Sequence, residues 1–253
     1  MTTTGTPDST QIDHADDRAS ELAQPSSEAR AMSLQDQLAK MRRDWDDRAV
    51  ENAQYYVCAK DLTQDEFFAT GETTVGEVIL NDMSNICLGK PPKEMRIVEI
   101  GCGVGRVTRV LSRIFGEVHA VDISGEMVRL AQHNLSGCTN AFTYQNNGAD
   151  LSVLPPLEFD FVFSHLVFQH IPSKNIIENY VRDVHRILRP GALFKFQLQG
   201  DTSIIPHLRP DDTWVGAPFS EDEVLEMAQR CGFDARYRVG AGGQYFWNWF
   251  FAV

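Results

Sequence analysis

The sequence lacks any run that approaches the ~20 consecutive apolar residues of a membrane-crossing helix. Its first ten residues, MTTTGTPDST, also lack the basic and apolar regions of a secretory signal. The five cysteines are odd in number and include no CxxC pair, so neither a zinc knuckle nor a disulfide framework is indicated. We therefore expect a cytoplasmic protein that has no membrane segment, keeps its thiols reduced and binds no metal.

Positive charge is also scarce. The 253 residues include 23 Lys and Arg against 35 Asp and Glu, which gives a formal net charge of −12. Nucleic-acid binding draws much of its affinity from basic side chains that neutralise phosphates, so this balance argues against a nucleic-acid partner. With 43% hydrophobic residues, the chain is long enough for one large domain with attachments.

The chain divides by composition into three parts. Residues 1–30 have few large apolar side chains, which predicts a disordered tail. Residues 31–90 show helical periodicity, with apolar side chains at three- and four-residue steps from Leu34 to Tyr56, and we expect a helical cap segment. Residues 91–253 form the predicted main domain.

Strands alternate with helices along the main domain. Short apolar runs predict strands at 96–100, 118–123, 142–145, 159–164 and 192–198, with helices at 104–115, 125–135 and 173–188 between them. A capping box at Ser220 opens a further helix, and a glycine-rich turn at 240–243 joins two last strands. This order predicts an α/β fold with a mostly parallel sheet, helices on both faces and one antiparallel strand near the C-terminus.

A glycine turn follows the first predicted strand. The residues are Glu99-Ile-Gly-Cys-Gly-Val-Gly105, and Asp122 lies at the end of the next strand. Glycines let the backbone turn sharply and approach a ligand, and an acid at this second position faces the two hydroxyls of a bound ribose. The sixth position of a dinucleotide-binding loop is usually small, whereas Arg106 occupies it here, which disfavours a nicotinamide-dependent oxidoreductase.

The glycine turn resembles motif I of the class I S-adenosylmethionine-dependent methyltransferases. The resemblance continues through Asn147-Gly-Ala-Asp-Leu151, Phe159-Asp-Phe-Val-Phe-Ser164 and Arg186-Ile-Leu-Arg-Pro-Gly-Ala-Leu193. It implies a Rossmann-like sheet of seven strands with a helical lid before motif I. It also implies S-adenosylmethionine as methyl donor and S-adenosylhomocysteine as product.

The resemblance also implies roles for individual residues on the donor side. Glu99, Gly101, Gly103 and Gly105 would border the methionine and ribose parts of the donor, and Asp122 would accept from both ribose hydroxyls. Ser164 would offer a backbone oxygen to the donor ammonium group. The adenine would be contacted by Ile123, the Asp150 carboxylate and the Leu151 backbone N–H.

The acceptor side is less well defined. His165, Gln169 and His170 follow the fourth predicted strand, where open α/β sheets bind ligands. A histidine there can take a proton near neutral pH, so His165 and His170 are the predicted catalytic residues, although each could instead be a hydrogen-bonded structural residue. Gln169, Tyr55, Tyr56 and Tyr245 are the predicted substrate-facing residues.

The function predicted from these features is methyl transfer to a small-molecule acceptor, by a monomer or homodimer. Two alternatives stay open. The protein could bind the donor without turnover, as a regulator or scaffold, or it could be an aminopropyl transferase. The second alternative needs extra carboxylates in the pocket for a polyamine, and none follow the fourth strand.

Overall fold

The computed structural model describes residues 32–58, 60–200 and 213–253. Residues 33–253 form one compact unit. The tail predicted for residues 1–30 lies outside the described residues. In the described part of the chain, no helix has both the length and the apolar composition that a membrane crossing needs.

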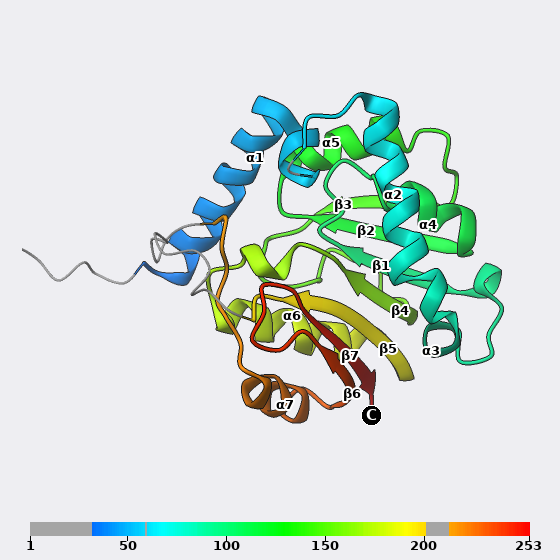
Figure 1. Cartoon of the computed structure of the whole chain (residues 1–253), viewed down its shortest axis with the longest axis vertical. Coiled ribbons are helices and arrows are strands. Elements are labelled where there is room, and N and C mark those ends of the chain that lie inside the picture. Colours follow the sequence, from blue (N-terminus) through cyan, green and yellow to red (C-terminus); the bar gives the residue numbers. More distant parts are fainter. Residues whose placement is uncertain (1–31, 59, 201–212) are drawn as a thin grey trace, which may run out of the picture. The chain divides into compact units, whose positions relative to one another are not determined.

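A seven-stranded sheet runs through the centre of this unit (Figure 1). The strand order is β3-β2-β1-β4-β5-β7-β6, and only β7 runs antiparallel to its neighbours. The bounds are β1 Arg96–Ile100, β2 Glu117–Asp122, β3 Ala141–Gln145, β4 Phe159–Ser164, β5 Leu188–Leu198, β6 Phe233–Val239 and β7 Phe246–Ala252. The predicted fold class is therefore confirmed, including the antiparallel strand near the C-terminus.

Helices cover both faces of the sheet. On one face, apolar side chains of β1, β4 and β5 pack against α2 (Gln64–Val78), α3 (Met83–Cys87) and α4 (Thr108–Ile114), while β2 packs against α5 (Gly125–Asn134). On the other face, a second core joins the sheet to α6 (Lys174–Ile187) and α7 (Glu221–Arg230). Short 3-10 turns lie at Leu80–Asp82, Pro92–Glu94 and Phe168–His170. Both faces of the central strands are thus buried, and in β4 (Phe159–Ser164) all six residues are buried.

The long helix α1 (Leu34–Cys58) packs beside α5 (Figure 1). Its path is broken at Asn52, whose backbone angles are not helical (φ −165°, ψ 83°). Asp46 fastens the helix, because its carboxylate accepts from the Ser124 hydroxyl at 2.6 Å and from the Glu126 N–H at 3.2 Å. Ser124 is also the N-cap of α5, so α1 is held at the positive end of that helix.

One strand begins earlier than its sequence predicts. The sequence predicts that β5 begins at Ala192, because Pro190 and Gly191 interrupt regular structure, yet the strand starts at Leu188. The strand accommodates the interruption by a register shift against β4, between the pairs Phe159–Leu188 and Phe161–Leu193. Gly191 has a φ of +77°, which glycine adopts without strain.

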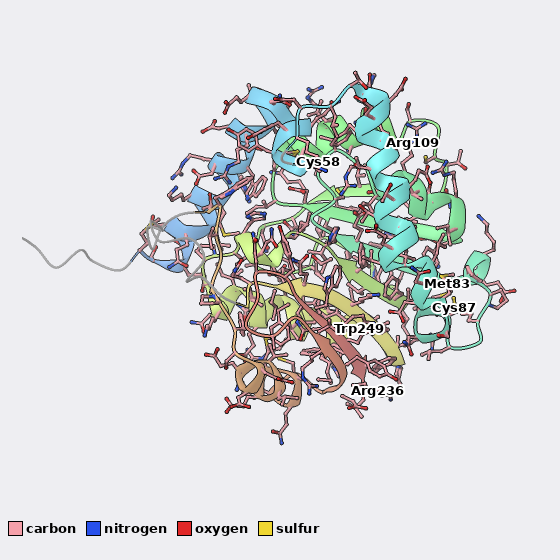
Figure 2. All side chains as sticks on the ribbon, in the orientation of Figure 1. Cys58, Met83, Cys87, Arg109, Arg236 and Trp249 are labelled. Atoms are coloured by element: carbon pink, nitrogen blue, oxygen red, sulfur yellow. The ribbon has the colours of Figure 1, made fainter. Side chains whose placement is uncertain are left out.

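A buried ion pair ties the helices before β1 to the sheet. Lys195 of β5 donates to the Val78 carbonyl at 2.6 Å and to the Asp82 carboxylate at 2.7 Å. Its ammonium group also lies 4.7 Å from the ring centre of Trp249 on β7, which Figure 2 labels. Asp82 accepts a further bond from the Trp249 indole, so both charges are compensated despite their burial.

Candidate functional site

A cavity of about 400 Å³ opens at the carboxyl ends of β1, β2 and β4. Its floor is the glycine turn after β1, and its walls come from α1, the turn after β4, residues 214–215 and the β6–β7 hairpin. The carboxyl ends of parallel strands are where open α/β sheets bind ligands. The side chains that line it include Trp45, Tyr56, Glu99, Arg106, Asp122, His165, Gln169, His170, Trp214 and Tyr245.

The three glycines of the turn have different structural roles. All have positive φ, at +77° for Gly101, +52° for Gly103 and +83° for Gly105. Gly101 and Gly103 line the cavity, and a Cβ on Gly101 would lie 2.2 Å from the Val167 side chain. Gly105 is outside the cavity lining, and a Cβ there would press on Leu135 at 3.0 Å. The first two glycines therefore keep the cavity floor open, while the third allows close packing.

Asp122 is the buried acid at the end of β2. Its two carboxylate oxygens accept from the Gly103 N–H at 2.8 Å and the Ser124 N–H at 2.9 Å. Burial raises the pKa of Asp122 to about 6, although these two backbone donors oppose the shift. Each oxygen keeps a free lone pair, so the carboxylate can accept two further hydrogen bonds from a ligand in the cavity.

Glu99 is a second acid at the floor. Its carboxyl group accepts from the Thr108 hydroxyl at 2.6 Å. Burial raises the pKa of Glu99 to about 8, against the opposing effects of the Thr108 hydrogen bond and the Arg106 charge. Glu99 is therefore largely protonated at neutral pH and can donate as well as accept a hydrogen bond.

His165 directly follows the carboxyl end of β4. Its ring stacks on Trp247 with the ring centres 5.3 Å apart, and its buried Nδ1 has no hydrogen-bond partner. Burial lowers the pKa of His165 to about 4, and the positive charge of Arg106 adds to the shift. The imidazole is thus neutral at physiological pH and able to accept a proton.

His170 has a different environment, because both of its ring nitrogens are engaged. Nδ1 contacts the Trp214 carbonyl oxygen, so it carries the hydrogen, and Nε2 accepts from the Gln169 amide at 3.3 Å. The Gln169 oxygen accepts in turn from Gln197 at 2.9 Å. This chain of three side chains fixes the turn after β4 against residues 213–215.

Comparison with known proteins shows what this chain resembles. Residues 98–196 match the model of a methyltransferase domain. The ubiquinone biosynthesis O-methyltransferase of Xanthomonas campestris pv. campestris is 28% identical over 98 residues, which cover 38% of this chain and 40% of that protein. The mitochondrial protein of the same name from Rattus norvegicus is 28% identical over 118 residues, covering 45% and 33%. The chain thus spans well under half the length of these curated relatives.

A solved structure extends the likeness beyond the matched segment. The magnesium protoporphyrin IX methyltransferase of Synechocystis PCC 6803, with bound S-adenosylhomocysteine, aligns with a TM-score of 0.62 at 15% identity. The alignment covers 85% of this chain and 99% of the Synechocystis chain. The chain therefore shares its fold with this S-adenosylmethionine-dependent methyltransferase, and its residues 98–196 are similar to a methyltransferase domain. The seven-stranded sheet of this chain and the glycine turn after its first strand have the arrangement that its sequence predicts.

The structure brings most of the predicted donor-side residues together. Glu99, Gly101, Gly103, Asp122 and Ile123 all line the cavity. The predicted residues that lie elsewhere are Gly105, Asp150, Leu151 and Ser164, whose hydroxyl donates to the Ile100 carbonyl at 3.0 Å.

The predicted adenine contacts after β3 are engaged locally. The Asp150 carboxylate accepts from the N–H and the hydroxyl of Ser152, at 2.9 and 2.6 Å. The Leu151 N–H donates to Asp183 on α6 at 2.7 Å. In this conformation neither group faces the cavity.

Two residues that the sequence analysis missed reach the cavity near Asp122. Asn146 is buried directly after β3 and donates to the Tyr180 hydroxyl at 2.7 Å. Tyr180 comes from α6 and also lines the cavity. The position of Asn146 at a strand end was the available signal, whereas nothing in the sequence pointed to Tyr180.

Aromatic side chains line the part of the cavity that is formed by α1 and residues 214–215. Trp45 lies edge-on to His170 at 5.2 Å, and Trp214 contacts both His170 and Tyr56, at 5.1 and 5.9 Å. Tyr56 and Tyr245 line the cavity as predicted substrate-facing residues, whereas Tyr55 does not and is partly exposed. Sequence reasoning missed Trp214, because no pattern ties it to strand ends.

Proposed function

We propose that this protein transfers a methyl group from S-adenosylmethionine to a small-molecule acceptor. The observation that carries the proposal is the Asp122 carboxylate, buried beside the glycine turn with two lone pairs free for the hydroxyls of a ribose. The methyltransferase domain matched over residues 98–196 supports the reaction class. No other carboxylate of the described residues except Glu99 lines the cavity.

The donor fits the residues that are present. Gly101 and Gly103 leave the cavity floor without side chains, and a Cβ on Gly101 would be blocked by Val167. Ile123 and Tyr180 offer apolar surface for an adenine beside Asp122, with Asn146 as a polar neighbour. When bound, S-adenosylmethionine supplies an activated methyl group and leaves as S-adenosylhomocysteine. The protein then has to align the acceptor and exclude water.

The acceptor side suits a molecule with a flat ring. Trp45, Tyr56 and Trp214 present ring surfaces, and Met41 and Val215 add apolar contacts. The polar groups between these walls, Gln169 and the two histidines, are neutral amide and imidazole groups. The matched relatives are named O-methyltransferases, which supports a hydroxyl group as the methylated position.

Within this proposal, His165 takes the proton of the acceptor hydroxyl. As the oxygen forms its bond to the methyl carbon, the carbon–sulfur bond breaks and its electron pair stays on sulfur. The released proton passes to the neutral imidazole of His165, whose low pKa keeps it unprotonated beforehand. His170 instead positions Gln169 and the Trp214 segment, because its own nitrogens are already engaged.

A turnover assay tests the proposal. The purified protein is incubated with S-adenosylmethionine and a panel of small hydroxylated aromatic compounds, and products are detected by mass as the gain of one methyl group. We expect at least one methylated product and a matching amount of S-adenosylhomocysteine, both absent with Asp122→Ala. Donor binding without transfer to any acceptor would instead support a regulatory or scaffold role. In a parallel incubation with decarboxylated S-adenosylmethionine and a polyamine, transfer of an aminopropyl group would support the aminopropyl transferase.

A further inference from the structure

Arg106 is a buried cation in the wall of the cavity. Only 6% of its surface is exposed, and it follows directly after the last glycine of the turn. Its Nη1 donates to two hydroxyls of α2, those of Thr70 at 3.1 Å and Thr74 at 3.0 Å. A buried guanidinium normally has a carboxylate partner, whereas here both partners are neutral.

The rest of this guanidinium has no partner among the described residues. Its Nε is buried and makes no hydrogen bond. The nearby acid, Glu99, makes no ion pair with it and is bonded to Thr108 instead. Glu99 is also largely protonated at neutral pH, because burial raises its pKa to about 8. Arg106 therefore brings an uncompensated positive charge to the cavity.

The residues around Arg106 hold its guanidinium in a position from which it can bind a ligand in the cavity. Arg106 lines the same cavity as Gly101, Gly103 and His165. Gly71 on α2 allows the close approach, since a Cβ there would lie 2.5 Å from the Arg106 carbonyl oxygen. The two threonines then hold the guanidinium in place, so that little conformational entropy is lost when an anion binds.

We propose that Arg106 binds a carboxylate of a ligand in this cavity. The planar fork of donors matches a carboxylate, and a buried charge without an acid partner gains most from one. The proposal rests on the proposed function and deepens it. Two sources of the group fit the position, the methionine carboxylate of the donor and a carboxylate on the acceptor.

The carboxylate site also bears on the choice of reaction. An aminopropyl transferase uses a decarboxylated donor, which would leave Arg106 without its partner if the donor is the source. Hydrogen bonds to charged groups contribute about 1.5–3 kcal/mol, which corresponds to roughly 10- to 150-fold in affinity. Discrimination for the carboxylate should fall within this range.

Two matched ligand pairs test the proposal and separate the sources. The donor pair is S-adenosylhomocysteine and 5′-(3-aminopropylthio)adenosine, which differ only in the carboxylate. The acceptor pair is 4-hydroxybenzoate and its uncharged isostere 4-hydroxybenzamide. Each is titrated by calorimetry into the wild type, Arg106→Met, Arg106→Lys and the control Arg109→Met. Arg109 is the exposed arginine of α4 labelled in Figure 2, and its guanidinium lies 5.1 Å from the Phe68 ring centre.

We expect the wild type and Arg109→Met to prefer the carboxylate member of one pair by 10-fold or more. Arg106→Met should lose this preference and Arg106→Lys should keep part of it. Preference within the donor pair assigns the site to the donor, and preference within the acceptor pair assigns it to the acceptor. Unchanged affinity of Arg106→Met for the uncharged or decarboxylated member shows that the variant is folded.

No preference within either pair, or a preference that persists in Arg106→Met, would overturn the proposal. Failure of the proposed function has a different signature. In that case neither nucleoside binds the wild type at all, while the benzoate pair still tests Arg106 separately.

Discussion

The two halves of the cavity are built in different ways. The donor half consists of strand ends and backbone, with Asp122 held by the N–H groups of Gly103 and Ser124. The acceptor half consists of side chains from distant segments, such as Trp45 on α1 and Trp214 before α7. Backbone geometry at strand ends is shared by a whole fold, whereas a wall of side chains can be changed residue by residue. We therefore expect the first half to define the donor and the second half the acceptor.

The largest expected effect is a loss of turnover in a variant that still binds the donor product. His165→Phe keeps an aromatic ring against Trp247 but removes the proton acceptor. General-base catalysis contributes typically 10²–10⁴-fold, so turnover should fall by about 100-fold or more. Affinity for S-adenosylhomocysteine should stay within about twofold, as measured by calorimetry. Turnover within threefold of the wild type would show that His165 is a structural residue.

A smaller effect is expected for the pH dependence of donor-side affinity, which involves Asp122. The pKa of Asp122 is raised to about 6, so the carboxylate that accepts from the ribose is present above this pH and is lost below it. Affinity for S-adenosylhomocysteine should therefore fall about tenfold between pH 7.5 and pH 5. Asp122→Asn should bind more weakly and lose the dependence. A wild-type affinity that is constant across this range would contradict the assignment.

The next effect tests the helix that spans both halves. Asp46→Ala removes the bonds from Ser124 and Glu126 that fasten α1 at the start of α5. At about 1 kcal/mol for each net hydrogen bond, the free energy of unfolding should fall by about 2 kcal/mol. Donor affinity should weaken several-fold because Asp46 holds Ser124, whose N–H donates to the Asp122 carboxylate. The exposed neighbour Asp47 provides the control, since Asp47→Ala should change neither quantity measurably.

The smallest effect is expected for Asp150, which the sequence predicts at the donor site and the structure places outside the cavity lining. Asp150 is the predicted contact of the adenine amino group, yet its carboxylate bonds to Ser152 and does not line the cavity. Asp150→Ala should therefore change affinity for S-adenosylhomocysteine by less than about twofold. Loss of tenfold or more would mean that the loop after β3 rearranges to bring Asp150 to the donor.

These contrasts explain what could be predicted from the sequence. β1 and β4 have their predicted bounds, and Asp122 lies in the cavity, because buried strands and glycine turns leave strong local signals. Arg106 appears in the sequence only as a poor fit to a dinucleotide-binding loop. Its burial without an acid depends on α2, whose threonines contact it from 32 and 36 residues away. Trp214 and Tyr180 reach the cavity for similar non-local reasons.

The central claim is that Asp122 and the glycine turn form a donor site for S-adenosylmethionine. The most direct test is a calorimetric titration of S-adenosylmethionine and S-adenosylhomocysteine into the wild type and Asp122→Ala, with NAD as the control ligand. We expect micromolar binding of the first two compounds, loss of that binding in Asp122→Ala, and no binding of NAD. Binding of NAD alone, or equal binding of S-adenosylmethionine by both proteins, would contradict it.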